Sequence, residues 1–136
     1  PVLAESRLVL LEDRVIISLP GELLFRPGSA QLTAKAGQAL FNLGGALRHV
    51  DNELGVNGYF TSAKAKPAGY GSHWELSLAR AVAVTNELKR AGYNKKIVAY
   101  GFADSRKRYL AGFARDARDR LAQRVDIVIL SESGAN

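Results

Sequence analysis

A ten-residue segment, SHWELSLARA at residues 72–81, brings together several side chains that could do chemistry. His73 and Ser77 are four residues apart, so a helix would place the imidazole and the hydroxyl on one face. Nucleophilic catalysis would also need an orienting carboxylate and an oxyanion hole. The sequence has no GxSxG elbow, and Ser77 would lie in the middle of a helix. We therefore do not expect a hydrolase.

Other catalytic and cofactor chemistry finds equally little support. The glycines form neither a GxGxxG nor a GxxxxGK[ST] motif, which argues against a nucleotide site. Cysteine is absent, which excludes disulfides, thiol nucleophiles and cysteine zinc sites. His49 and His73 are too few for a histidine metal site, and no carboxylate pair recurs in a glycosidase-like pattern. We expect a protein that is not an enzyme and that holds no metal or cofactor.

The charge of the chain narrows the class of partner. The formal net charge is +6, which favours anionic partners such as nucleic acid, anionic lipid or an acidic cell-wall polymer, and which equally serves solubility. The most basic stretch, residues 106–124, is interrupted by Asp116 and Asp119. Alternating signs on a helix are more typical of a solvated face than of a track for phosphates. We therefore do not expect nucleic-acid binding.

The elements that must position these residues alternate along the chain. Short β-branched or alternating runs predict strands, and amphipathic runs predict helices, with Thr33 as the expected cap of the first helix and Gly92 as the expected end of the second. The predicted strands are residues 14–19, 54–60, 96–102 and 124–130, and the predicted helices are residues 33–50, 73–91 and 109–122. The order is β-α-β-α-β-α-β, and right-handed crossovers then place helices on one face of a sheet. This pattern predicts a two-layer α/β sandwich.

The helix at 73–91 and the chain ends complete the expectations from pattern alone. Its expected buried stripe is Trp74, Leu78, Ala81, Val82, Thr85 and Leu88, with Trp74 as a core or loop-anchoring aromatic. Residues 14–130 are expected to form the domain. Residues 1–13 are a linker or a lead-in helix or strand, and residues 131–136 are a polar tail. Because the chain starts at Pro1 and has no methionine, we expect a processed or excised fragment.

Several motifs resemble those of one family. Residues 73–88 read His-x-x-Leu-Ser-x-x-Arg-Ala-x-x-Val-x-x-x-Leu. This resembles the signature helix of the OmpA-like peptidoglycan-binding domains, with His73 in place of a leading asparagine. Three further segments are similar to family motifs in the same order, namely 25–33 (FRPGSAQLT), 101–106 (GFADSR) and 124–127 (RVDI). The resemblance implies an α/β (α+β) two-layer sandwich with a mixed four-stranded sheet and helices on one face.

Within the family, residues 72–77 (SHWELS) are most similar to the Ser-Asn-Trp-Glu-Leu-Ser of MotB-like flagellar stator proteins, and the long loop at 61–72 is similar as well. This resemblance implies a periplasmic domain that anchors a motor stator to the cell wall. It also implies a homodimer, a membrane-embedded stator partner, and a tether to the inner membrane through an N-terminal helix absent from this chain.

The resemblance also implies a site. In the family, an arginine of the signature helix and an aspartate after the second strand hold the diaminopimelate of the peptidoglycan stem peptide. Arg80 falls on the arginine position, where its planar guanidinium can grip a carboxylate. Thr61 takes the aspartate position and offers no charge to an ammonium group. The expected site comprises Arg80, Thr61, His73, Phe60 and Ser77, with Arg124 and Tyr59 in support.

These departures leave two functions open. The retained Arg80 and the basic charge favour peptidoglycan binding. Thr61 favours a degenerate member that has lost peptidoglycan binding and acts as a protein-interaction or dimerisation module. An open pocket lined by Arg80, Thr61 and His73 would favour the first, and a pocket filled by Tyr59 or Phe60 would favour the second.

Overall fold

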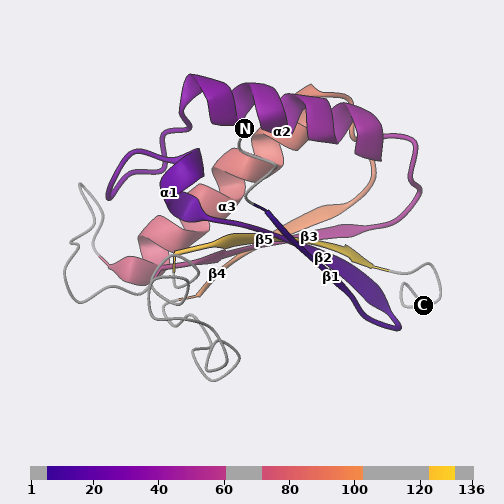
Figure 1. The fold of residues 1–136 in the computed structure, drawn as a ribbon, viewed down its shortest axis with the longest axis horizontal. Coiled ribbons are helices and arrows are strands. Elements are labelled where there is room, and N and C mark those ends of the chain that lie inside the picture. Colours follow the sequence, from indigo (N-terminus) through magenta and orange to yellow (C-terminus); the bar gives the residue numbers. More distant parts are fainter. Residues whose placement is uncertain (1–5, 61–71, 103–122, 131–136) are drawn as a thin grey trace.

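The computed structural model describes residues 6–60, 72–102 and 123–130, which form one sheet and the helices that cover it. The strands are β1 (Arg7–Leu10), β2 (Arg14–Leu19), β3 (Leu54–Tyr59), β4 (Ile97–Phe102) and β5 (Val125–Leu130). The helices are α1 (Gly21–Leu24), α2 (Ala34–Leu47) and α3 (His73–Arg90). Figure 1 shows α2 and α3 packed together on one face of the sheet. The α+β two-layer class is therefore confirmed.

The sheet is mixed, as predicted, but it has five strands where four were expected. The order is β1-β2-β5-β3-β4, with β3 and β4 parallel and every other neighbouring pair antiparallel. The additional strand, β1, lies within the predicted lead-in segment. It forms because two apolar runs flank the polar turn Glu12–Asp13, and the Leu11 N–H donates to the Arg14 oxygen at 2.9 Å.

The capping predictions for the long helices are confirmed. The Thr33 hydroxyl accepts a hydrogen bond from the Ala36 N–H at 3.1 Å, and α2 begins at the next residue. Gly92 follows the end of α3 with a φ of 108°, the left-handed conformation that glycine adopts most easily. None of the helices in the described ranges is long and apolar enough to cross a membrane. The predicted helix at 109–122 and most of the loop at 61–72 lie outside the described residues.

The buried face of α3 is partly different from the predicted stripe. Ala81, Thr85 and Leu88 are buried as expected, but Trp74 and Val82 are 49% and 41% exposed. The polar residues Ser77 and Arg80 take inner positions instead. The prediction was wrong at Trp74 and Val82 because it left Ser77 and Arg80 out of the buried face and so placed that face too far around the helix axis.

Two glycines set how closely α3 approaches the sheet. Gly58 of β3 and Gly101 of β4 are paired across the parallel ladder. A Cβ atom at Gly58 would lie 2.1 Å from the backbone oxygen of Ser77, and one at Gly101 would lie 2.7 Å from the backbone nitrogen of Leu78. The backbone of α3 therefore packs directly against these two glycines, which sets the distance between the sheet and the helix turns that carry Ser77 and Arg80.

Candidate functional site

Arg80 is buried and held in place by a loop that lies far away in sequence. Its side chain is among the largest fully buried ones, and the residue is 2% exposed. Nε donates to the backbone oxygen of Ser29 at 2.8 Å, and Nη2 donates to the backbone oxygen of Arg26 at 3.4 Å. Both acceptors belong to the segment between α1 and α2. The backbone carbonyls thus stabilise the guanidinium and fix the plane in which it lies.

The local sequence explains why these carbonyls face the guanidinium. In the segment Arg26–Pro27–Gly28–Ser29, the Ser29 N–H donates to the Arg26 oxygen at 3.1 Å, and Gly28 has a φ of 66°. A proline followed by a glycine with positive φ is the signature of a type II turn. An isolated bridge between Phe25 and Leu32 closes the base of this loop.

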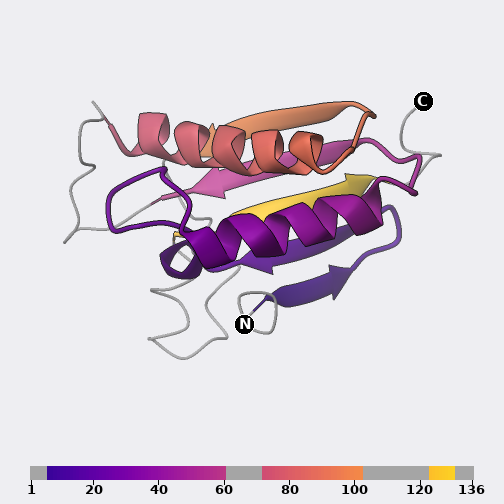
Figure 2. The same cartoon turned by 90° about the horizontal axis from the view of Figure 1, so that it is seen from above.

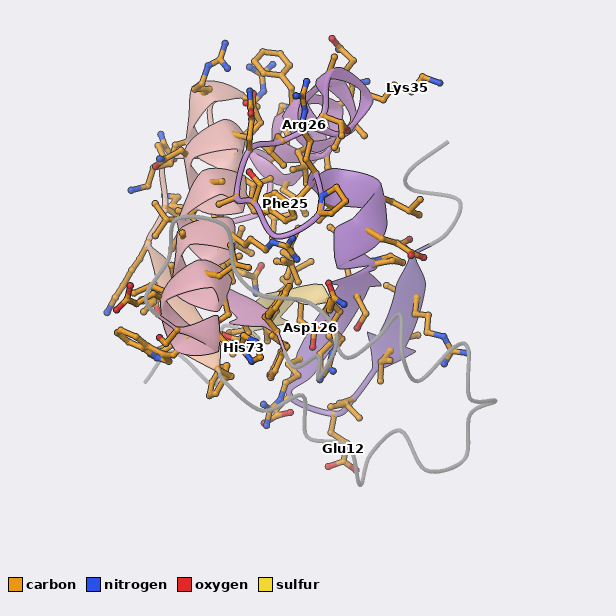
Figure 3. The ribbon with its side chains drawn as sticks, turned by 90° about the vertical axis from the view of Figure 1, so that its left-hand side faces the viewer. Glu12, Phe25, Arg26, Lys35, His73 and Asp126 are labelled. Atoms are coloured by element: carbon orange, nitrogen blue, oxygen red, sulfur yellow. The ribbon has the colours of Figure 1, made fainter. Side chains whose placement is uncertain are left out.

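Two aromatic rings flank the guanidinium. The Arg80 Cζ atom lies 4.8 Å from the centroid of the Phe25 ring and 5.0 Å from that of Phe60. Both rings are buried, and both distances are within the range of cation–π attraction. Figure 3 shows Phe25 in the space between α3 and the segment that joins α1 to α2. Of the predicted site residues, Phe60 therefore packs directly on Arg80.

His73 and Ser77 contribute differently from one another. The His73 ring meets the Phe60 ring edge-on at 5.0 Å between centroids, so Phe60 contacts both Arg80 and His73. The Ser77 hydroxyl donates to the Trp74 oxygen of its own helix at 2.8 Å, and the residue is fully buried. The Ser77 hydroxyl is therefore engaged by the backbone of its own helix. The structure thus brings together Arg80, Phe60 and His73, while Thr61 lies outside the described residues.

A second cluster surrounds Arg124 at the start of β5. The Arg124 Cζ atom lies 4.0 Å from the centroid of the Tyr59 ring, which itself stacks on Phe102 at 4.9 Å. Arg124 Nε donates to Asp126 Oδ2 at 3.2 Å, and both residues are buried. Because Asp126 is paired with Asn57 and Ser18 across the sheet, it lies on the face opposite the apolar row of Val56 and Ile127.

Sequence reasoning missed Asp126. Its signal was an acidic residue inside the apolar strand RVDIVIL, two positions after an arginine and therefore on the same strand face. Burial raises the pKa of the Asp126 carboxyl above its ordinary value, and the Arg124 charge together with hydrogen bonds from Ser18 and Arg124 offsets only part of that effect. Asp126 Oδ1 is buried with no hydrogen-bond partner among the described residues.

The described residues of the site offer charge and aromatic surface. Among the described residues, no group of three histidine, cysteine, aspartate or glutamate side chains is placed to hold a metal ion. Ser77 and His73 do not form a nucleophile and base, because the hydroxyl is bonded to its own helix backbone. The two buried arginines, each stacked on aromatic rings, are suited to recognising an anionic group or to bracing the loops around them.

Comparison with known proteins identifies one family and one curated relative. The model of the OmpA family matches residues 24–120. The curated protein YtxE of Bacillus subtilis (strain 168), described as uncharacterized, is 31% identical over 97 residues, which are 70% of this chain and 40% of that protein. The chain therefore spans about two-fifths of the length of this relative.

Solved structures show the same fold. The cell wall anchor of the T6SS from Pseudomonas aeruginosa is 26% identical with a TM-score of 0.81, and the match covers 95% of this chain and 90% of that one. The periplasmic domain of Helicobacter pylori MotB is 20% identical with a TM-score of 0.76, covering 96% and 82%. A putative MotB-like protein from Desulfovibrio vulgaris is 23% identical with a TM-score of 0.77, covering 93% and 82%.

Proposed function

This chain belongs to the OmpA family, and we propose that it is a non-catalytic periplasmic domain that binds peptidoglycan and anchors a membrane-embedded assembly to the cell wall. The likeness to a cell wall anchor at 26% identity supports this role. The observation that carries the proposal is the placement of Arg80. The arginine of the signature helix is present, and carbonyl groups and two rings hold its guanidinium in one orientation.

The proposed ligand is the stem peptide of peptidoglycan, through its diaminopimelate. A guanidinium presents paired N–H donors that match a carboxylate, and this match is stronger inside a protein than in water. Phe60 packs on Arg80 and His73 packs on Phe60, and both are the proposed neighbours of the ligand, together with Thr61. Arg124 and Tyr59 are proposed to support the site from the other face of the sheet.

The finer role we propose is that of a MotB-like flagellar stator anchor. The SHWELS segment and the likeness in fold to MotB periplasmic domains support it. In this proposal the domain is tethered to the inner membrane by a segment that precedes the chain. It acts as a homodimer together with a membrane-embedded stator partner.

One observation favours a second candidate, a degenerate domain that no longer binds peptidoglycan. Arg80 is 2% exposed and Phe60 is fully buried against it, so the position that a ligand would occupy is filled by the chain itself. A ligand carboxylate would have to displace Phe60 or replace the carbonyls of Arg26 and Ser29. In this second candidate the domain is a protein-interaction module.

The test is co-sedimentation of the purified domain with insoluble peptidoglycan sacculi. We expect the wild type to sediment and Arg80→Ala to stay in solution, with circular dichroism showing that the variant is folded. Arg90→Ala is the matched control, because Arg90 is exposed at the other end of α3 and the variant loses the same charge. Thr61→Asp adds a charged acceptor for an ammonium group, worth ~1.5–3 kcal/mol, and should tighten binding roughly ten- to a hundredfold.

The two candidates predict different results. If the wild type stays in solution and Thr61→Asp sediments, the site is a decayed one and the degenerate domain is the better description. Equal sedimentation of the wild type, Arg80→Ala and Arg90→Ala would mean that binding does not depend on this site.

A further inference from the structure

The outer edge of the sheet carries an exposed apolar strand that no function proposed above uses. β1 is one of the two edge strands of the described sheet, β4 being the other, and all four residues of β1 are exposed. Leu8, Val9 and Leu10 are 64%, 41% and 71% exposed, and the adjoining Leu11 is 49% exposed. Figure 2 shows β1 beyond α2, outside the area that the helices cover. An exposed edge with large apolar side chains on both faces is a template for pairing with another strand.

The hydrogen-bond pattern shows which backbone groups this edge offers. The Leu11 N–H donates to the Arg14 oxygen, so Leu11 and Arg14 are a hydrogen-bonded pair. Pairs alternate along an antiparallel ladder, and the next hydrogen-bonded residues of β1 are therefore Val9 and Arg7. The N–H and C=O groups of Leu8 and Leu10 consequently point away from β2, toward the free edge.

We propose that β1 is a dimerisation edge, and that it pairs antiparallel with β1 of a second copy of this chain. A two-fold axis perpendicular to the sheet keeps both helix layers on the same side. With Val9 at the axis, Leu8 of each copy lies opposite Leu10 of the other. These are the residues whose backbone groups point outward, so each backbone donor finds an acceptor.

The side chains fit this pairing on both faces. Leu8 and Leu10 are paired with Ile17 and Val15 of β2, and Ile17 packs against the core, so the two leucines lie on the helix-bearing face. Across the axis they form a continuous apolar row beside α2 of each copy. On the other face, Val9 meets Val9 of the second copy.

Charge also favours a second copy over an unrelated strand. Arg7 lies at one end of β1, and the acidic turn Glu12–Asp13 lies just beyond the other end. Antiparallel pairing therefore brings the basic end of each copy to the acidic turn of its partner. The strand lacks the usual devices that block edge pairing, since it has no proline and its only charge is at its end.

The expected dimer is weak. Four residues on each side bury far less than the roughly 1,200 Å² of the smallest stable interfaces, so we expect a dissociation constant of about 0.1–1 mM. The homodimer belongs to the proposed function, and this inference rests on that part of it and adds the edge at which the two copies meet. Peptidoglycan binding and self-association are measured separately, so either can fail alone.

Analytical ultracentrifugation over about 10 μM to 2 mM tests the proposal. We expect the wild type to pass from monomer to dimer, and L8K/L10K to stay monomeric because like charges would face each other. L8K/L10E is expected to dimerise again, since the Leu8–Leu10 register places opposite charges face to face twice. Val82→Lys is the matched control, because Val82 is an exposed apolar residue on α3 and the variant should associate like the wild type.

Three results would overturn the proposal. A wild type that is monomeric over the whole range would do so, as would association that L8K/L10K leaves intact. A monomeric wild type that binds vesicles of phosphatidylglycerol, and loses this binding in L8K/L10K, would show that the edge faces lipid instead. If L8K/L10K is monomeric but still sediments with sacculi, the dimer edge and the cell-wall site are separate.

Discussion

The contact between α3 and the sheet allows a sharp prediction at Gly58. Replacing it by alanine would put a Cβ atom 2.1 Å from the Ser77 oxygen and 2.9 Å from the Ser77 carbonyl carbon. Ordinary contact begins at 3.4 Å, so α3 and β3 would have to separate by about 1.3 Å (3.4 minus 2.1). Neither colliding atom can rotate away, because both belong to the helix backbone.

The expected destabilisation follows from that separation. Overpacking a core costs about 1–3 kcal/mol, and a collision between backbone segments places Gly58→Ala at the upper end, near 3 kcal/mol. Lifting α3 also loosens the contacts of Ala81, Val84 and Leu88, which are fully buried between the helix and the sheet. The free energy of unfolding of a domain this size is about 5–15 kcal/mol, so the loss is a large fraction of it.

Gly55 provides the control within the same strand. A Cβ atom there would lie 3.7 Å from the Val128 Cβ atom, an ordinary contact, so Gly55→Ala should change stability by less than about 1 kcal/mol. Urea unfolding followed by circular dichroism measures both variants. With a slope of ~1–3 kcal/mol per molar urea, the midpoint of Gly58→Ala should fall by about 1–3 M. Midpoints for Gly58→Ala and Gly55→Ala that agree within error would refute the argument.

Three further predictions follow from the caps, the open glycine and the buried carboxylate. Ser72→Ala removes the hydroxyl that accepts from the Glu75 N–H at 3.1 Å, and should lower the free energy of unfolding by about 1 kcal/mol in the same urea assay. Gly45→Ala in α2 places a Cβ atom where no neighbour lies within 4 Å. It should raise the free energy of unfolding by roughly 0.5–1 kcal/mol in the same urea assay. Burial raises the pKa of Asp126 in the folded protein, so above pH 3.8 the unfolded chain releases this proton while the folded protein still holds it. The free energy of unfolding therefore falls as pH rises above 3.8. Asp126→Asn removes this pH dependence, so the urea midpoint of the variant should rise relative to that of the wild type from pH 4 to 5.5 to 7. A difference between the two midpoints that does not change with pH would contradict this.

The elements that the sequence predicted well are those with local signals. The run RVIISL and the alternation in RVDIVIL predicted β2 and β5 within one residue, and Thr33 and Gly92 marked helix ends through their own side chain or backbone. Each of these signals acts over a few residues. The resemblance to the OmpA-like family supplied the mixed sheet and pointed to Arg80, which no local pattern distinguishes from a surface arginine.

Two of the features that the sequence did not predict depend on distant contacts, and a third, β1, depends on a hairpin with the next strand. Arg80 can be buried because the carbonyls of Arg26 and Ser29, more than fifty residues earlier, accept hydrogen bonds from its Nη2 and Nε. β1 requires β2 as its partner, and its weak pattern became a strand only through that hairpin. Gly58 and Gly101 share a face only because β3 and β4 pair in one particular register. No short window along the chain contains both members of the Arg80 or the glycine contacts, whereas the missed signal for β1 was local, in the apolar runs on either side of Glu12–Asp13.

The position of β5 in the sheet limits the order in which the chain can fold. β5 is the last element along the described part of the chain, yet it lies between β2 and β3 and pairs with both. Until residues 125–130 are available, the hairpin of β1 and β2 has no ladder connecting it to β3 and β4. A chain synthesised from its N-terminus can therefore form local structure early, but the described sheet is completed only when β5 is available. Truncation within β5 would divide the sheet into two parts rather than shorten it at one edge.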